Sequence, residues 1–370
     1  MKNCLITALS FFYFLFIFPP AIVAQTLCTD GAGLNQRAAA DFTLAVISDT
    51  HTGGPESSYT PGNFAKVTRW IADHKSELNI QFVFHTGDVT AGDRIMVPPL
   101  PPLSDQWLEA STAMKNLEWN IPYSITVGNR DDVLFFDQYF GLIHFSDQPW
   151  YGGGFPAGAN TSSYYLFSAS GYDFIIFSGN NVTEAQKIFQ AYPYRNGIYV
   201  PHIYVNLDGT VSSTIIQNMI KSQDNVFMTL NGHTHCYPTA SYVCRNTITN
   251  NFGHPVYQIT HPSSPIIRLY LFRPEKQVIC AYTYNPIENT FYTVSNSQFS
   301  LNWNLRSAAH KPGDANEDGI VNGADFSIWL NNYSKIIPTP VTNSHRNGDF
   351  NSDGVVNGAD FSIWLNNYGR

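Results

Sequence analysis

Three short apolar runs within the first 130 residues each end in polar residues of the kinds that bind metal ions. The runs and the residues that follow them are 42–48 with Asp49-Thr50-His51, 82–85 with Thr86-Gly87-Asp88, and 122–127 with Gly128-Asn129. Stretches with helical character, around 63–76 and 107–117, separate the runs. This alternation predicts β-α-β-α-β units, whose sites lie beyond the carboxyl ends of the strands. We therefore expect these polar side chains to meet at one edge of a sheet.

The second half of the catalytic part is richer in short β-type runs. Residues 163–169 and 172–178 predict a hairpin, and residues 199–205 and 226–230 predict two further strands. Several short runs follow between 255 and 294, so we expect this half to be mostly antiparallel. The predicted fold is an α/β protein in which two sheets stack face to face as a β-sandwich, with helices on the outside.

Further imidazoles occur in this second half. His202 lies within the 199–205 run, and His233 and His235 lie two residues apart in Asn231-Gly-His-Thr-His. A lone histidine on an apolar strand is more often structural than a ligand. The histidines that compete with His202 for a ligand role are His85, His144, His254 and His261. Together with the strand-end motifs, these residues make a set of carboxylates, imidazoles and one amide, which suits iron, zinc or manganese.

The order of these motifs resembles the calcineurin-like metallophosphoesterase family, whose pattern is DxH, GD, GNH(D/E), a single His and GHxH. Residues 41–295 contain counterparts of these motifs in the same order. The resemblance implies the family's αββα fold for residues 25–305, with two transition-metal ions. The implied ligands are Asp49, His51 and His235 for one ion, Asn129, His202 and His233 for the other, and Asp88 as the bridge between them. Such a site hydrolyses phosphate mono- or diesters by a metal-activated hydroxide.

Arg130 departs from the family pattern, which has a histidine after the asparagine ligand. In the family that histidine helps to stabilise the phosphoryl group and can protonate the leaving oxygen. Arginine has a pKa above about 12 and cannot donate a proton, although it can hold phosphate oxygens through two N–H groups. One hypothesis is a working phosphoesterase whose catalytic residues are Asn129, Arg130 and Asp131. The alternative is a catalytically impaired protein that binds ligands at a surface. We favour the first because the ligand set is intact.

Asp131 follows Arg130 directly and has two interpretations. It orients a neighbouring residue or a metal-bound water, or it is a solvated acid of a turn.

Residues 313–333 and 348–368 are near-identical copies of one segment. Each copy begins a twelve-residue loop with oxygen-bearing residues at positions one, three, five, nine and twelve and a glycine at position six, which is calcium-binding spacing. Position seven would contribute a backbone carbonyl. The expected ligands are Asp314, Asn316, Asp318, Ile320, Asn322 and Asp325 in the first loop, and Asp349, Asn351, Asp353, Val355, Asn357 and Asp360 in the second.

A duplicated calcium loop with one helix after each copy resembles the type I dockerin domain. The resemblance covers residues 312–370 and implies that residues 306–370 form a small α-helical domain with two Ca²⁺ ions and a cohesin-type partner on a scaffold or cell surface. Gly323-Ala324 and Gly358-Ala359 replace the hydroxyl residues that cohesin-binding dockerins often carry. A calcium-stapled stalk without a cohesin partner is therefore the alternative. Carbohydrate or membrane binding by the tail ranks lower, because aromatic residues at helical spacing are more often core.

The N-terminal 24 residues indicate a secretory signal peptide. Lys2 precedes an apolar stretch over residues 5–18, and a small residue, Ala24, ends the segment. A retained membrane anchor is the alternative. The remaining cysteines, which are Cys28, Cys236, Cys244 and Cys280, are even in number, as two disulfides in an exported protein require. Three pairings are open, and Cys236–Cys244 with Cys28–Cys280 is the simplest.

The charge balance argues against a polyanionic macromolecule as the main partner. The formal net charge is −8 and the sequence has no long basic run, so we expect no specific nucleic-acid binding. We expect membrane contact only through the signal peptide. The chain is thus expected to be secreted or extracytoplasmic and attached to a scaffold or surface through its tail, with a phosphate ester as substrate.

Overall fold

The computed structural model describes most of the chain beyond the N-terminal segment. The described residues are 28, 34, 37–54, 60–93, 99–155, 161–306, 312–316, 320–337, 344–351 and 354–369. The signal peptide predicted over residues 1–24 lies outside them. None of the helices in the described part has the length and apolar character that crossing a membrane would require.

The first of two sheets has seven strands, with β1 near its centre. Its order is β13-β12-β11-β1-β2-β3, and β14 pairs with β12. The strands are β1 (Phe42–Ile47), β2 (Ile80–His85), β3 (Tyr123–Ile125), β11 (Ile267–Arg273), β12 (Val278–Asn285), β13 (Thr290–Tyr292) and β14 (Phe299–Asn302). Strands β1, β2 and β3 are parallel, whereas β11 runs antiparallel to β1. The residues that follow β1, β2 and β3 therefore leave the sheet at the same edge.

The second sheet also has seven strands, in the order β4-β5-β6-β7-β8-β10-β9. They are β4 (Tyr151–Phe155), β5 (Ser162–Ala169), β6 (Tyr172–Ser178), β7 (Asn196–Val200), β8 (Val226–Asn231), β9 (Arg245–Thr249) and β10 (Pro255–Thr260). The expectation of a mostly antiparallel half is wrong for its centre, because β6, β7, β8 and β10 are parallel neighbours. Helices α7 (Val182–Ala191) and α8 (Thr214–Lys221) supply the crossovers that parallel strands need.

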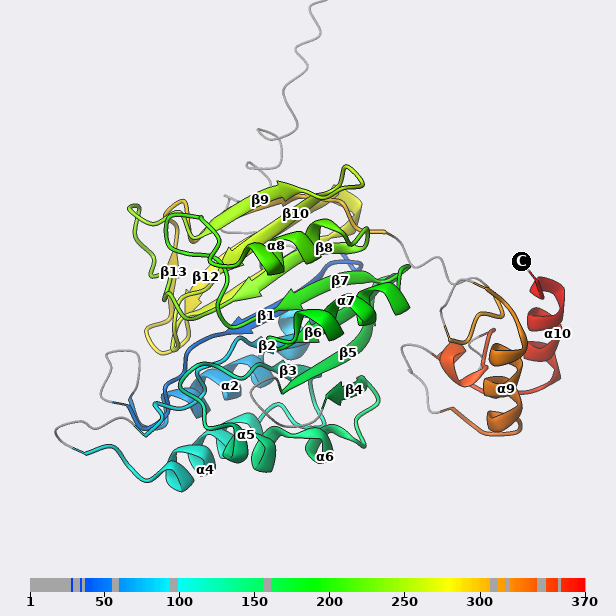
Figure 1. The fold of residues 1–370 in the computed structure, drawn as a ribbon, viewed down its shortest axis with the longest axis horizontal. Helices are drawn as coiled ribbons and strands as arrows, with labels where there is room; N and C mark the ends of the chain where they lie inside the picture. Colours follow the sequence, from blue (N-terminus) through cyan, green and yellow to red (C-terminus); the bar gives the residue numbers. More distant parts are fainter. Residues whose placement is uncertain are drawn as a thin grey trace, which may run out of the picture.

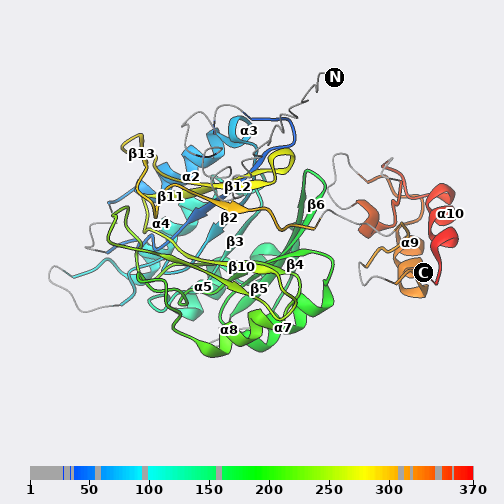
Figure 2. The same ribbon diagram turned by 90° about the horizontal axis from the view of Figure 1, so that it is seen from above.

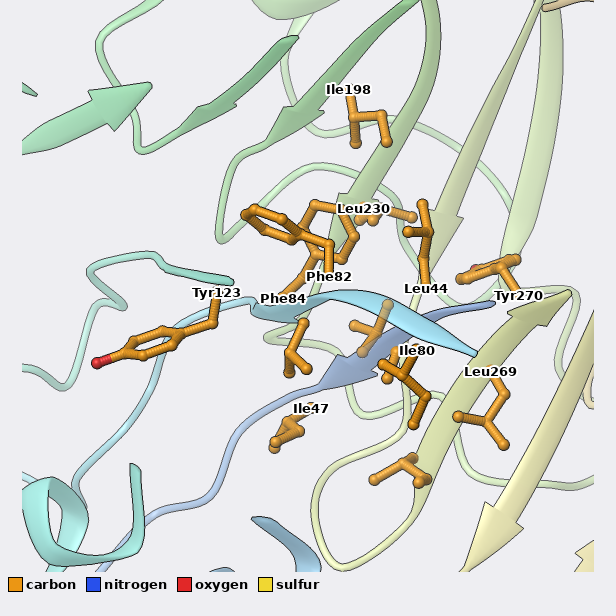
Figure 3. Close-up of a cluster of buried hydrophobic side chains, with 14 of the residues drawn as sticks. Leu44, Ile47, Ile80, Phe82, Phe84, Tyr123, Ile198, Leu230, Leu269 and Tyr270 are labelled. Carbon is orange, nitrogen blue, oxygen red and sulfur yellow. The ribbon is translucent and has the colours of Figure 1, made fainter. Parts of the chain in front are cut away.

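The two sheets pack face to face through aromatic and aliphatic side chains. Phe42 on β1 contacts Phe174 on β6, with ring centroids 5.9 Å apart, and Phe82 on β2 stacks on Phe167 of β5 at 4.9 Å. Figure 3 shows Phe82 within this buried cluster, close to Leu230 of the second sheet. Burial of such a continuous apolar layer is the main favourable contribution to folding.

Helices cover the outer faces of both sheets (Figures 1 and 2). The helices between the strands of the first sheet are α2 (Asn63–Asp73), α3 (Lys75–Leu78), α4 (Leu103–Met114) and α5 (Val133–Phe140), and η1 (Pro274–Lys276) joins β11 to β12. Helix α6 (Leu142–Phe145) lies at the edges of both sheets, where Phe145 contacts Tyr123 of β3 and Tyr151 of β4. Helices α7 and α8 pack on the second sheet through a separate apolar cluster that includes Phe189 and Ile220. The predicted α/β sandwich with outer helices is thus confirmed.

The tail has its own small core around helices α9 (Gly323–Asn332) and α10 (Gly358–Asn367), with η2 (Ser344–Asn347) before the second loop. Its buried apolar residues include Trp329 and Val356. Each copy donates one hydrogen bond to the other. Trp329 Nε1 donates to the carbonyl of Asn357 at 3.0 Å, and Trp364 Nε1 donates to the carbonyl of Asn322 at 2.9 Å. The aromatic residues of the repeat therefore act as core, as their helical spacing predicts.

Two disulfides connect the cysteines in the simplest of the three pairings. Cys28 pairs with Cys280 across 252 residues, and Cys236 pairs with Cys244 across 8. The first links the segment before β1 to β12. The second closes the loop after the Gly232–His235 motif, so it restrains the backbone next to that motif.

Candidate metal centre

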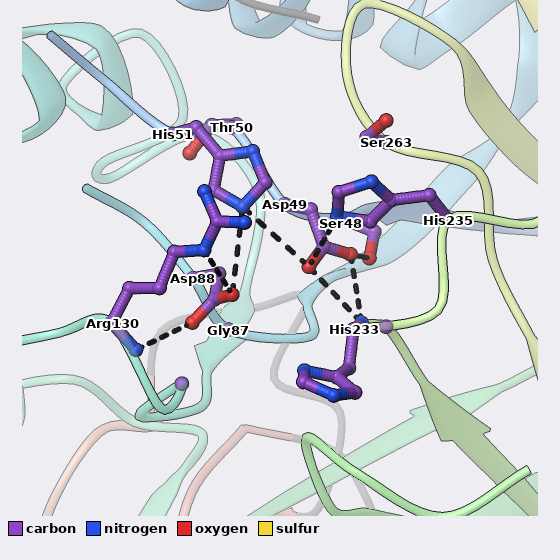
Figure 4. A network of polar contacts seen from close by, with 12 residues as sticks. Ser48, Asp49, Thr50, His51, Gly87, Asp88, Arg130, His233, His235 and Ser263 are labelled. Atoms are coloured by element: carbon purple, nitrogen blue, oxygen red, sulfur yellow. Dashed lines mark hydrogen bonds and ion pairs between the residues drawn. The ribbon is translucent and has the colours of Figure 1, made fainter. Parts of the chain in front are cut away.

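The strand-end motifs of both sheets meet at one place (Figure 4). Loops after β1, β2 and β3 carry Asp49, His51, Asp88 and Asn129, and loops after β7 and β8 carry the three later histidines. His202 follows β7, which ends at Val200, rather than lying within the predicted 199–205 strand. The parallel direction of β7 and β8 is what brings their carboxyl ends to the same edge.

Five of the candidate ligands adopt a backbone conformation that non-glycine residues rarely take. The φ angles are 46° at Asp49, 44° at His51, 50° at Asp88, 68° at His233 and 49° at His235. Left-handed conformations cost L-residues about 1–2 kcal/mol each and gather at functional sites, where the surrounding fold enforces them. The occurrence of five such conformations in one site indicates that the surrounding fold directs these side chains toward one point.

The candidate ligands form two groups. Asp49, His51 and His235 make one, Asp88, His202 and His233 make the other, and within each group the donor atoms lie within 4.8 Å of one another. Asp88 faces both groups with different oxygens. Its Oδ2 lies 3.5 Å from His51 Nε2, and its Oδ1 lies 3.3 Å from His202 Nε2. This is the placement that a bridging carboxylate requires.

Asn129 adds an amide oxygen to the second group. Its Oδ1 lies 3.1 Å from His202 Nε2. All seven predicted metal ligands therefore come together, and the five loops contribute oxygen and nitrogen donors in the mixture that iron, zinc or manganese prefers.

The spacing of the donors fits metal ions. In the first group, His235 Nε2 lies 3.5 Å and His51 Nε2 lies 4.0 Å from Asp49 Oδ1. Two ligands bound about 2.1 Å from one ion at angles of about 90–110° would be about 3.0–3.4 Å apart. The observed separations are close to these values and longer than ordinary hydrogen bonds. The donor set is thus arranged around two points that a cation can occupy.

The charge of the site also fits metal ions. Burial would raise the pKa of Asp88, but hydrogen bonds from His202 and His51 outweigh burial and hold the pKa below its usual range. Burial likewise raises the pKa of Asp49, and contacts with His235 and His202 bring it below normal. Both carboxylates are therefore anionic near neutral pH. Burial lowers the pKa of His233, which favours its neutral, ligand-competent form.

Residues outside the ligand set orient the ligands. His202 Nδ1 donates to the carbonyl of Thr86 at 2.8 Å, which leaves Nε2 to face the site. Ser48 donates to Asp49 Oδ2, and Thr86 Oγ1 donates to Ser48 Oγ at 2.6 Å. The backbone N–H of His233 donates to Asp49 Oδ1 at 3.0 Å. The sequence reasoning missed Ser48 and Thr86, although both are polar residues directly at the ends of apolar runs.

The histidines that competed with His202 are engaged elsewhere. Their partners are Thr50 and Gly87 for His85, Tyr123 and Glu118 for His144, Asp224 for His254, and Asn231 and Tyr270 for His261. Burial lowers the pKa of His85 to about 3, so this residue is a neutral support behind the loop after β2.

Arg130 lies against the shared carboxylate. Its backbone N–H donates to Asp88 Oδ1 at 2.9 Å, and its Nε lies 3.4 Å from Asp88 Oδ2. The side chain is 14% exposed, so the guanidinium sits at the edge of the site with limited contact with solvent.

Asp131 is buried, which contradicts the interpretation as a solvated turn acid. Its carboxylate accepts hydrogen bonds from the backbone N–H groups of Val89, Thr90 and Gly128, at 3.2, 3.0 and 2.8 Å. Burial and the nearby charge of Asp88 raise its pKa to about 6. The residue ties the loop after β2 to the loop after β3, so it positions Asp88 and Asn129.

The predicted calcium loops of the tail are described in part. Asp325 accepts from the N–H groups of Ala315, Asn316 and Asn322, and Asp360 makes the equivalent bonds in the second copy. These bonds close each loop around its last predicted ligand. Of the other predicted ligands, Asp318 and Asp353 lie outside the described residues.

Comparison with known proteins decides the family. Residues 42–257 match the family model for calcineurin-like phosphoesterases. The chain belongs to this family. Residues 312–368 of this calcineurin-like phosphoesterase match the model of the type I dockerin domain, so the second resemblance is confirmed as well.

Individual proteins similar to this phosphoesterase come from several organisms. It is 31% identical over 210 residues to the uncharacterized protein YvnB of Bacillus subtilis (strain 168), an alignment that covers 52% of this chain and 15% of that protein. Similar solved structures include GAP50, the anchor in the inner membrane complex of Plasmodium. It has 11% sequence identity and a TM-score of 0.43, and the match covers 73% of this chain and 90% of that structure. A dimetal phosphatase from Danio rerio has 12% sequence identity and a TM-score of 0.39, and the match covers 69% of this chain and 99% of that structure. Purple acid phosphatase PPD1 from Lupinus luteus has 12% sequence identity and a TM-score of 0.43, and the match covers 73% of this chain and 55% of that structure.

The positioning role of Asp131 can be tested by substitution. Asp131→Ala leaves three N–H groups without their acceptor, and we expect the free energy of unfolding to fall by about 2–4 kcal/mol. Asp132→Ala is the matched control. It removes a helix cap that accepts from Leu134 and Phe135, and should cost only about 1 kcal/mol. Denaturant unfolding measures both. Equal losses would show that Asp131 does not hold the loops together.

Proposed function

We propose that this protein is an exported phosphoesterase that depends on two metal ions and hydrolyses phosphate mono- or diesters. The observation that carries the proposal is the placement of Asp88, whose two oxygens face two separate ligand groups. Asp49, His51 and His235 would hold one ion, and Asn129, His202 and His233 the other. When bound, such ions supply positive charge to the phosphoryl oxygens and acidify water.

Arg130 would bind phosphoryl oxygen in this proposal. Its guanidinium is beside Asp88 and at the edge of both ligand groups, and its N–H groups suit phosphate geometry. A guanidinium is a poor general acid, so protonation of the leaving group must come from water or another residue. Esters whose leaving groups are stable as anions should therefore react best.

The contact between Arg130 and Asp88 also favours a second candidate function. A guanidinium 3.4 Å from Asp88 Oδ2 competes with a metal ion for the same carboxylate. A protein in which that contact persists would keep the fold as a surface binding protein and have little or no hydrolytic activity.

For the tail we propose two Ca²⁺ sites and a cohesin-type partner. The family match and the loop spacing support this proposal. Leu330 and Leu365, at equivalent positions of the two copies, are 54% and 55% exposed, which provides similar apolar surface on both helices. A partner on a scaffold or cell surface would attach the enzyme there.

We also propose that the chain is exported and consists of two units, residues 25–305 and 306–370, after a cleaved signal peptide. The two disulfides support an oxidising compartment, since cytosolic thiols are normally kept reduced.

Hydrolysis of p-nitrophenyl phosphate and bis-p-nitrophenyl phosphate, with Mn²⁺, Zn²⁺ or iron added, tests the proposed activity. We expect metal-dependent turnover that Asp88→Asn reduces by at least about 100-fold, because the shared carboxylate is lost. Asp105→Asn, on the exposed start of α4, is the matched control and should retain activity. Absence of turnover from folded protein with every metal would favour the binding function instead. The preferred ester distinguishes a monoesterase from a diesterase.

The effect of lacking a general acid at position 130 can be tested separately. Arg130→His restores a group that can donate a proton, so it should raise turnover of phenyl phosphate relative to p-nitrophenyl phosphate by at least about tenfold. The ratio of the two kcat/KM values is the measurement, since it cancels changes in metal loading. An unchanged ratio would show that leaving-group protonation does not depend on this position.

Calcium dependence of the tail can be read from its two tryptophans. Chelation of Ca²⁺ should loosen both loops and reduce the near-ultraviolet circular dichroism of Trp329 and Trp364, which pack between the copies. Asp325→Ala should weaken Ca²⁺ binding in calorimetric titration. The control is Asp208→Ala, an exposed acid of the catalytic part. A signal insensitive to Ca²⁺ would contradict the proposed calcium sites.

A further inference from the structure

A cavity of about 290 Å³ opens beside the metal centre. Four separate parts of the chain form its walls, namely the start of α2, the loop between β8 and β9, the loop between β10 and β11, and the turn between β12 and β13. Six of its lining residues matter for its chemistry, and they are Asn63, Tyr237, Ser263, Asn285, Glu288 and Tyr292. Its volume is at the small end of ligand-binding cavities and has room for roughly ten water molecules.

The cavity adjoins the ligand group of Asp49, His51 and His235. Tyr237 donates its backbone N–H to the carbonyl of His235 at 2.7 Å, and the rings of these two residues lie 6.2 Å apart. Ser263 Oγ donates to Tyr237 Oη at 3.0 Å, and Figure 4 shows Ser263 on the same side as His235. Ser264 N–H donates to the carbonyl of Ser48, the residue before Asp49, at 2.7 Å. Residues that line the cavity thus contact His235 and the residue before Asp49 directly.

The lining is polar but nearly free of charge. Hydroxyl and amide groups dominate, and among the eleven residues that line the cavity Glu288 alone carries a charge. The backbone of the turn is fixed at Glu288, whose side chain is exposed, because Asn285 Oδ1 accepts from the N–H groups of Ile287 and Glu288 at 3.0 and 3.3 Å. Tyr292 Oη donates to Glu288 Oε2 at 3.4 Å. Within the described lining, the charge that faces a bound group is therefore the negative charge of Glu288.

We propose that this cavity binds the alcohol part of the substrate, and that this alcohol carries several hydroxyl groups and no negative charge, as a polyol or a sugar does. The inference rests on the proposed phosphoesterase function. Hydroxyl groups can exchange hydrogen bonds with the serine, tyrosine and asparagine side chains, and their C–H faces can lie on the tyrosine rings. An anionic alcohol would meet Glu288 without a compensating cation among the lining residues. Glu288 is thus a specificity-determining residue.

Two matched monoesters test the proposal with the full chain. Glycerol 3-phosphate and 3-phosphoglycerate share a three-carbon skeleton and differ in whether the far end is a hydroxyl or a carboxylate. Release of inorganic phosphate should give a kcat/KM for glycerol 3-phosphate at least about tenfold higher. Glu288→Gln should narrow that ratio by about tenfold, mainly through KM for the anionic ester. Glu275→Gln, an exposed acid at the other end of β11, is the matched control and should leave the ratio unchanged.

Each outcome separates the cavity from the catalytic function. Equal kcat/KM values, with p-nitrophenyl phosphate hydrolysed, would overturn the cavity proposal and leave the phosphoesterase intact. A preference for phosphocholine over glycerol 3-phosphate would also overturn it, because the cavity would then select a cation. If p-nitrophenyl phosphate is not hydrolysed, the proposed function fails. Calorimetric titration of the metal-loaded protein with the two esters then tests the cavity proposal independently of turnover. Tighter binding of glycerol 3-phosphate supports the proposal, and equal affinities refute it.

Discussion

Asp88 keeps a carboxylate nearly out of contact with solvent, and much of the surrounding structure compensates for that buried charge. His51 faces one of its oxygens and His202 faces the other, and the N–H of Arg130 donates to it. The loops around it leave no room for larger residues. A Cβ at Gly128 would lie 2.1 Å from the backbone nitrogen of Asp88, and a Cβ at Gly87 would lie 2.6 Å from His202 Nδ1. The loops can close on the carboxylate only because both positions are glycine.

The local part of the site was predictable from sequence because its information is local. Asp49 and His51, or His233 and His235, lie two apart after apolar runs, and a strand end fixes where they point. The arrangement of the second sheet was not predictable in the same way. Helices α7 and α8 have only ten and eight residues, and without them the neighbouring runs resemble an antiparallel meander. Recognition of these crossovers would have predicted that β7 and β8 are parallel and that their loops meet β1 and β2.

Arg130 and Asp131 show why adjacency in sequence does not determine a role. Arg130 turns toward the ligand groups, whereas Asp131 turns away from them and accepts three backbone N–H groups. Sequence reasoning placed both in one catalytic set, because the pattern gives residue types but not side-chain direction. Asp131 is a positioning residue in the structure. The difference depends on tertiary contacts with Val89 and Thr90, some forty residues away, which no short motif encodes.

The tail couples its two copies through hydrogen bonds rather than merely repeating a module. Each indole donates to the carbonyl of the residue that caps the other copy's helix, Asn357 or Asn322. The same two asparagines cap their helices with their side chains and are predicted loop ligands. Loosening one loop therefore removes the acceptor for a tryptophan that belongs to the other copy. Because the copies are nearly identical, each one supplies an equivalent indole donor and an equivalent carbonyl acceptor, and both hydrogen bonds can form. The two hydrogen bonds therefore couple the copies, and we expect the tail to unfold as one cooperative unit.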